Sequence, residues 1–159
     1  MALKITNSLS KKKEDLKPLQ GQRINMYTCG VTVYDECHLG HARSLYVFDV
    51  IRRYLKFRGY DLHFVRNITD IDDKIIDKAK ELHQTSQEVT QENIRLYFRD
   101  LEALAIDKAD REPQATHKEN LEEMIRCIKG LMEKGFAYAM EGDVYFNVRK
   151  FKDYGKLSG

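Results

Sequence analysis

The sequence predicts an α/β protein in which two parallel strands are joined by a helix. Residues 23–28 are partly β-branched or aromatic and are soon followed by Gly30, which is typical of a strand. Residues 44–58 carry apolar side chains on most faces, end in basic residues and precede Gly59, which is typical of a helix and its stop. Residues 61–67 predict a second strand. We therefore expect a right-handed βαβ crossover whose helix is largely buried.

The rest of the chain predicts helices and one hairpin. Residues 85–88 and 116–119 both read Thr-x-x-Glu, the pattern of a capping box at a helix start. We expect the first of these helices to run to about Leu104 and the second to stop at Gly135. Both carry apolar stripes at helical spacing, which predicts that they face a core. Residues 136–148 predict a β-hairpin.

Composition places few limits on function. The chain has 159 residues, of which 42% are hydrophobic and 33% charged, enough for one ordinary globular core. A net charge of +2 is too small to indicate nucleic-acid binding, and lysines 11–13 are expected in a solvated loop. Three cysteines without framework spacing indicate a reducing compartment, with Cys127 in or near the core. With no membrane-spanning stretch or signal peptide in view, we expect a cytoplasmic protein without a membrane partner.

The turn between the first strand and its helix carries the candidate chemistry. Cys29 lies at the strand end, and His38 and His41 lie three residues apart at the helix start. Ligands bind at this edge of open α/β sheets, and a helix N-terminus attracts phosphate. Two imidazoles there can donate to phosphate oxygens, while Gly40 lets a purine or ribose approach the backbone. The alternative is a capping histidine, a surface histidine and an ordinary apolar cysteine.

The second strand ends at the same edge, beside Thr69. This threonine is either a ligand-pocket residue or a helix N-cap. Asp70, Asp72 and Asp73 crowd the start of the next helix, where capping and the helix dipole explain them better than magnesium binding or general-base catalysis does. The loop at 109–114 brings His117 toward the site, or else His117 is an ordinary first-turn residue.

These residues resemble a known family. His-Leu-Gly-His at 38–41 resembles the His-Ile-Gly-His signature of class I aminoacyl-tRNA synthetases, and residues 27–35 resemble the cysteinyl-tRNA synthetases in particular. The similarity runs from about Leu3 to Gly159. Later motifs of the same family are resembled by residues 66–76, 115–117 and 142–146.

The resemblance implies a Rossmann-like parallel sheet, the first half of a class I catalytic domain, with a helical and β-hairpin insertion. Residues 1–84 would form the first part of the nucleotide-binding catalytic domain. Residues 85–159 would form a helical segment and hairpin that begin an inserted connective region. Later parts of the enzyme, including its second phosphate-binding loop and its tRNA-binding domains, would then lie outside this sequence.

The implied activity is that of an aminoacyl-tRNA ligase. ATP activates L-cysteine as cysteinyl-adenylate, and the cysteinyl group passes to tRNA(Cys). The resemblance makes His38 and His41 the catalytic residues of this chain. The implied ATP-binding residues are His38, Leu39, Gly40 and His41.

The resemblance also implies a cysteine pocket that contains Cys29, Gly30 and Thr69. Cys29 matches the first of four Zn²⁺ ligands, and the other three belong to a later part of the family's chain. Zinc would bind the substrate thiolate, which a serine hydroxyl replaces poorly. Because one ligand does not hold a zinc ion, we expect residues 1–159 alone to be inactive.

Two alternatives remain open from sequence. A related class I ligase joins cysteine to an amino-sugar acceptor and shares the cysteine pocket and the ATP signature. The second alternative is a short non-catalytic paralogue that binds nucleotide, amino acid or a protein partner.

Overall fold

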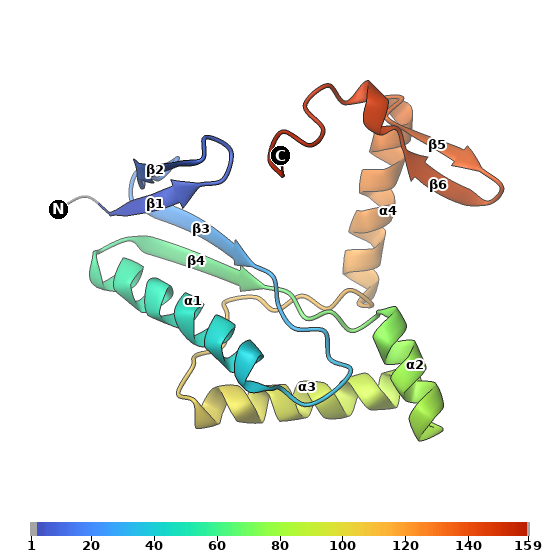
Figure 1. Ribbon diagram of the computed structural model, residues 1–159, viewed down its shortest axis with the longest axis horizontal. Coiled ribbons are helices and arrows are strands. Elements are labelled where there is room, and N and C mark those ends of the chain that lie inside the picture. Colours follow the sequence, from blue (N-terminus) through green and yellow to red (C-terminus); the bar gives the residue numbers. More distant parts are fainter. Residues whose placement is uncertain (1–2, 159) are drawn as a thin grey trace. The chain divides into compact units, whose positions relative to one another are not determined.

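A computed structural model describes residues 3–158 of the chain (Figure 1). Two compact units are present. One comprises Pro18–Asn120, and the other joins the segment up to Lys17 with the segment from Leu121 onward. Among the described residues, the strands form three separate two-stranded sheets.

The Pro18–Asn120 unit contains the predicted βαβ crossover. Strand β3 (Arg23–Thr28), helix α1 (Leu39–Phe57) and strand β4 (Asp61–Arg66) follow one another, and the two strands pair in parallel (Figure 1). Gly59, with a φ of +82°, follows the end of α1 as the sequence predicts. An isolated parallel bridge between Thr32 and Thr69 continues the pairing beyond both strands. The crossover and its parallel register are therefore confirmed.

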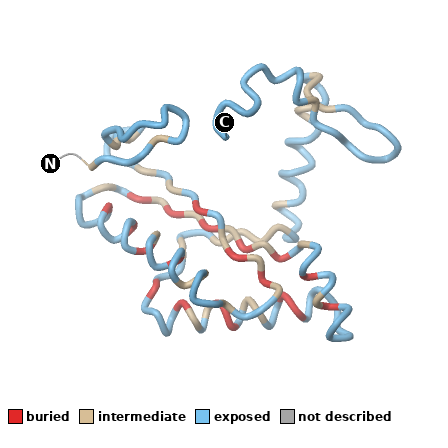
Figure 2. The backbone as a smooth tube through the Cα atoms, viewed as in Figure 1, coloured by how far each residue is buried: buried red, intermediate tan, exposed pale blue. Residues whose placement is uncertain are grey.

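The prediction that α1 is largely buried is wrong for the described chain. The helix packs against β4, and only one stripe of it is buried (Figure 2), because two strands cover little more than one face of a helix. Its buried residues are Leu45, Asp49, Arg52 and Leu55. The large apolar side chains that stay exposed are Leu39, Tyr46, Val47, Val50, Ile51, Tyr54 and Phe57.

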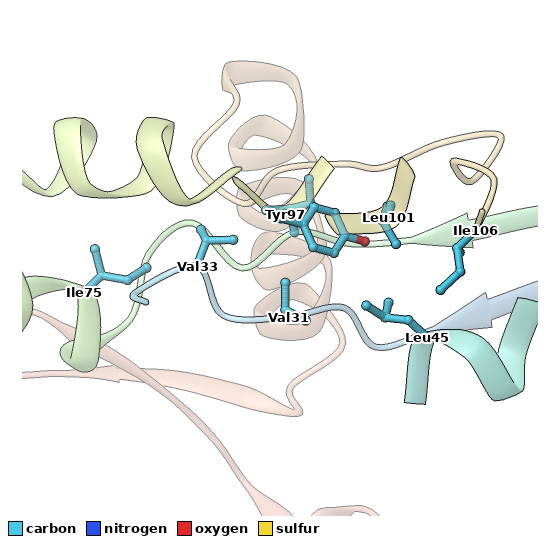
Figure 3. Packing of buried hydrophobic residues seen from close by; sticks show 8 residues of the cluster. Val31, Val33, Leu45, Ile75, Tyr97, Leu101 and Ile106 are labelled. Carbon is cyan, nitrogen blue, oxygen red and sulfur yellow. The ribbon is translucent and has the colours of Figure 1, made fainter. Parts of the chain in front are cut away.

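The core of this unit lies beneath the ligand-binding edge expected from sequence. Val31 and Val33, in the turn between β3 and α1, are 8% and 2% exposed. They pack with Ile68, which is 1% exposed and follows β4. Figure 3 shows the same cluster gathering side chains from α1, α2 and α3 around this turn. The turn that carries the candidate site is thus held by buried apolar contacts on its inner side.

Helices α2 (Asp73–Leu82) and α3 (Ser86–Ala103) pack against each other. The capping box at the start of α3 is confirmed: Glu88 N donates to Thr85 Oγ1 at 3.2 Å, and Thr85 N donates to Glu88 Oε2 at 2.8 Å. Helix α2 is capped by Asp72, whose carboxylate accepts from Lys74 N at 3.0 Å. Thr69 is therefore not an N-cap.

The polar loop after α3, which includes residues 109–114, pairs with β4 and with the segment that follows β4. Arg111 and Gln114 form isolated parallel bridges with Val65 and Ile68, so the loop runs alongside β4 and beyond its end. Within it, Glu112 accepts from the guanidinium of Arg66 at 2.7 Å, and the two side chains are 9% and 2% exposed.

The second unit contains two antiparallel pairs of strands. Strands β1 (Lys4–Asn7) and β2 (Lys12–Asp15) form one pair. Lysines 12 and 13 therefore lie in a strand, and the expectation of a plain loop is wrong there, although every residue of β2 is exposed as a solvated segment would be. Strands β5 (Ala137–Met140) and β6 (Asp143–Phe146) form the predicted hairpin. A 3-10 turn, η1 (Val148–Lys150), follows.

Helix α4 (Lys118–Glu133) forms where the sequence predicts a helix, but two expectations about it are wrong. None of its residues is buried in the described chain, and Cys127 is exposed (Figure 2). The predicted capping box is also missing, because Thr116 bonds to Asp70 and the helix begins at Lys118. An apolar stripe predicts a core only where another element lies against it.

Candidate functional site

His38 is the N-cap of α1, and His41 closes a reciprocal capping box. Gly40 N donates to His38 Nδ1 at 3.0 Å, and His38 N donates to His41 Nδ1 at 3.4 Å. The two imidazole rings stack with their centroids 3.9 Å apart. The sequence left two readings open, a phosphate-binding pair or a capping histidine. The geometry makes His38 a cap through Nδ1. Its Nε2 takes no part in the cap and can still bind a ligand.

This capping fixes the tautomer of both rings. A neutral imidazole carries its hydrogen on one nitrogen and accepts with the other. Since Nδ1 accepts a backbone N–H in each ring, the hydrogen lies on Nε2 of His38 and of His41. Burial, and secondarily the charge of His38, lower the pKa of His41 below its ordinary value, which favours this neutral form. Two Nε2–H donors at a helix N-terminus suit the binding of phosphate oxygens.

Gly40 leaves room for the His38 ring in its capping position. A Cβ at this position would lie 2.8 Å from Cε1 and 2.9 Å from Nδ1 of the His38 ring. Both distances are shorter than nonbonded contacts allow, so a side chain here would displace the ring. This reason for glycine comes in addition to the ligand approach expected from sequence.

Asn67 joins the ends of β3 and β4. Its Oδ1 accepts from Gly30 N at 2.9 Å and from the hydroxyl of Tyr27 at 2.9 Å, and its Nδ2 donates to Thr69 Oγ1 at 3.0 Å. Two predicted pocket residues, Gly30 and Thr69, are thereby brought together around one amide. Sequence reasoning missed Asn67 and Tyr27. The available signal was their place at strand ends, inside the two stretches that carry the family resemblance.

Cys29 follows β3 directly and precedes Gly30 in the chain. Its side chain is exposed, as a metal or substrate ligand requires. Among residues 3–158, however, no three histidine, cysteine, aspartate or glutamate side chains gather closely enough to hold a metal ion. The residues described here therefore supply one thiolate and do not form a zinc site, because stable zinc binding takes three or four protein ligands.

Asp70 and His117 belong to a neighbouring part of the unit. Asp70 is 7% exposed, and its carboxylate accepts from Thr116 N at 3.1 Å and from Thr116 Oγ1. Capping therefore explains Asp72 but not Asp70. Asp70, Thr116 and His117 line a cavity of about 590 Å³ beside α2 and α3. No described contact joins His117 to His38 or His41, and the role of His117 stays a prediction.

The fold is that of an α/β protein with the class I synthetase architecture. Methionyl-tRNA synthetase of Mycobacterium tuberculosis, solved in complex with methionyl-adenylate, superposes with a TM-score of 0.68. The match covers 73% of this chain and 23% of that chain at 22% sequence identity, so it shows the fold alone. The Rossmann-like fold class predicted from sequence is confirmed.

The sequence comparison narrows the class further. The family described as "tRNA synthetases class I (C) catalytic domain" matches residues 15–159, and the chain belongs to this family. Cysteine–tRNA ligases of Gloeothece citriformis and Maridesulfovibrio salexigens are 49% and 52% identical over 159 and 158 residues. That of Aquifex aeolicus is 51% identical over 158 residues. The chain spans about a third of the length of these relatives, 32% in each case.

In the part of the chain that the structure describes, no helix combines the length and the apolar character needed to cross a membrane.

Proposed function

We propose that this chain forms the phosphate-binding and cysteine-binding part of a cysteine–tRNA ligase. One observation carries the proposal: the capping box engages Nδ1 of both stacked imidazoles and so leaves an Nε2–H on each of them at the N-terminus of α1. The names of relatives about 50% identical to the whole chain supply the amino acid and the acceptor, L-cysteine and tRNA(Cys).

The reaction joins two anions. A carboxylate oxygen of cysteine attacks the α-phosphorus of ATP, an O–P bond forms, and the bond between the α-phosphorus and pyrophosphate breaks. A carboxylate is already ionised at neutral pH, so no protein base is needed for this step. His38 and His41 donate Nε2–H hydrogen bonds to phosphate oxygens, where negative charge accumulates as pyrophosphate leaves. A ribose hydroxyl at the 3′ end of the tRNA then attacks the carbonyl carbon of the adenylate; an ester bond forms, the bond to AMP breaks, and AMP and the hydroxyl proton are released.

Gly30 and Thr69 bind the amino acid in this proposal, with Cys29 beside them. Cys29 is proposed as one thiolate ligand of a zinc ion whose other ligands lie outside residues 3–158. For the same reason we propose that residues 1–159 alone do not catalyse adenylate formation.

Cysteine-dependent ATP–pyrophosphate exchange tests the proposal in the protein at its native length. Wild-type protein should support exchange with cysteine and not with serine. His38→Asn and His41→Asn should each lower kcat by about 10²-fold or more, the scale of one lost transition-state donor. His83→Asn is the matched control, since His83 is exposed with a φ of +55°, a conformation that asparagine tolerates. Exchange that persists in both site variants would contradict the assignment.

The acceptor is tested separately. Transfer of radiolabelled cysteine to tRNA(Cys) supports the tRNA ligase, whereas transfer to an amino sugar and not to tRNA would support the related sugar ligase. If the protein forms no cysteinyl-adenylate and transfers cysteine to neither acceptor, the result would support a non-catalytic paralogue.

A further inference from the structure

We propose that Asn67 is a positioning residue that sets the hydrogen-bond polarity of the amino-acid pocket, so that Tyr27 offers the ligand an acceptor and Thr69 offers it a donor. The inference rests on the proposed function, because it assigns the two hydroxyls to parts of a bound amino acid. Its basis is the set of three hydrogen bonds that Asn67 makes to Gly30, Tyr27 and Thr69.

The orientation of the Asn67 amide follows from its backbone partner. A backbone N–H can only donate, so the amide atom that faces Gly30 N at 2.9 Å has to be Oδ1. Nδ2 then faces Thr69 Oγ1. The usual ambiguity between the oxygen and nitrogen of an asparagine amide is removed here by chemistry.

The amide in turn orients both hydroxyls. Oδ1 has no hydrogen, so the Tyr27 hydroxyl donates its only hydrogen to Oδ1. The lone pairs of the Tyr27 oxygen can then accept a hydrogen bond from a ligand. Thr69 Oγ1 accepts from Nδ2, so its own hydrogen is left to donate elsewhere. Tyr27 is 64% exposed and Thr69 is partly exposed, which leaves both oxygens within reach of a ligand.

Gly30 makes this arrangement rigid. A Cβ at Gly30 would overlap the carbonyl oxygen of Asn67, so the backbones of the two strand ends approach each other more closely than any side chain allows. The side chain of Asn67 also links the two strand ends, because its Oδ1 accepts from Gly30 N. Backbone contact and amide hydrogen bonds together hold both hydroxyls in place.

A zwitterionic amino acid matches this polarity. Its ammonium group has only donors and meets the lone pairs of Tyr27 Oη, whereas its carboxylate oxygens or side-chain sulfur accept from Thr69 Oγ1–H. An uncharged amide sets both polarities without adding a negative charge. An aspartate at position 67 would still accept from Gly30 and Tyr27, but it would draw the Thr69 hydrogen onto itself.

Asn67→Asp therefore tests the proposal, with Asn25→Asp as the matched control. Asn25 is exposed on β3, so the control introduces the same charge on the neighbouring strand. In the native-length protein, Asn67→Asp and Thr69→Val should each raise KM for cysteine about tenfold, the scale of one hydrogen bond, with KM for ATP unchanged. Asn25→Asp should leave both KM values unchanged.

The double variant separates positioning from general damage. If Asn67→Asp acts through the Thr69 hydroxyl, then combining it with Thr69→Val gives a KM no higher than that of Thr69→Val alone. Effects that multiply, to about a hundredfold, would overturn the proposal.

Tyr27→Phe tests the acceptor half. We expect a higher KM for cysteine and an unchanged inhibition constant for 3-mercaptopropionate, which has the thiol and carboxylate but no ammonium group. Equal weakening of both would overturn the assignment of Tyr27 to the ammonium.

Hydrogen exchange of the Gly30 amide tests the Asn67 network without an activity assay, and so separately from the proposed function. Asn67→Ala should accelerate hydrogen exchange of the Gly30 amide at least tenfold, whereas Asn67→Asp should leave it protected. If wild-type protein shows no cysteine-dependent exchange of pyrophosphate, the proposed function fails. Unchanged protection of Gly30 in Asn67→Ala would instead overturn the network itself.

Discussion

The imidazole rings of His38 and His41 stack with an interplanar angle of 23° and share one capping box. Burial, followed by the charge of His38, lowers the pKa of His41 below the ordinary value of 6.5. The unfolded chain therefore binds the proton more tightly than the folded chain does. Above pH 6.5 His41 is mainly neutral in both states and has little effect on the free energy of unfolding. As pH falls from there to the lower pKa of the folded state, protonation of the unfolded chain lowers the free energy of unfolding.

We expect His41 to titrate below 6.5 in a proton–carbon NMR titration, and His38→Asn to raise its pKa. Asparagine keeps an N-cap acceptor and removes the neighbouring charge. The rise should be partial, because burial of His41 is the larger cause and remains. A His41 pKa that does not change in His38→Asn would show that His38 exerts no electrostatic effect.

Gly40→Ala should destabilise the fold by about 1 kcal/mol, because the His38 ring has to leave its capping position. Gly130→Ala is the comparison: Gly130 lies within α4 with no atom near its Cβ position, so alanine there should stabilise the helix by roughly 0.5–1 kcal/mol. Urea denaturation followed by circular dichroism measures both. Equal effects of the same sign would show that Gly40 does not seat the ring.

Glu112→Gln should lower the free energy of unfolding by about 3 kcal/mol, because it leaves the buried guanidinium of Arg66 without its carboxylate. Arg66 also lies over the rings of Phe64 and Tyr97, which offer no full counter-charge. Glu92→Gln removes the carboxylate of an exposed pair with Arg95 and should change stability little. Similar denaturation midpoints for the two variants would contradict the importance of burial.

Cys37 should react with iodoacetamide more slowly than Cys127 at about pH 8. Burial, and secondarily the negative charge of Asp100, raise the pKa of the Cys37 thiol and so reduce its thiolate fraction. Cys127 is exposed and serves as the internal reference. Mass spectrometry of timed samples gives both rates, and faster labelling of Cys37 would contradict the prediction.

Local signals in the sequence were sufficient for the βαβ crossover, the later helices and the hairpin, but not for β1 and β2. Strand β3, strand β4 and the helix between them were predicted because apolar pattern, terminal glycine and helix caps all act within a few residues. The capping box of Thr85 and Glu88 formed for the same reason. The motif around His38 also identified the family, since a long string of matched residues does not depend on knowing the fold.

Tertiary structure decided which of those signals were used. Thr116 could cap a helix, yet it bonds to Asp70, 46 residues away, because that buried carboxylate needs donors. The apolar faces of α1 and α4 look like core in sequence, but burial depends on what packs against them, and much of each face is exposed in residues 3–158.

The amino-acid pocket shows the same division. The sequence alone predicts that Gly30 and Thr69 follow two strands of one crossover, and therefore that they lie at the same edge. Only the fold decided that Asn67 stands between them and turns one hydroxyl into an acceptor and the other into a donor. Hydrogen-bond direction depends on angles and distances between separate strands, and no spacing within one segment encodes them.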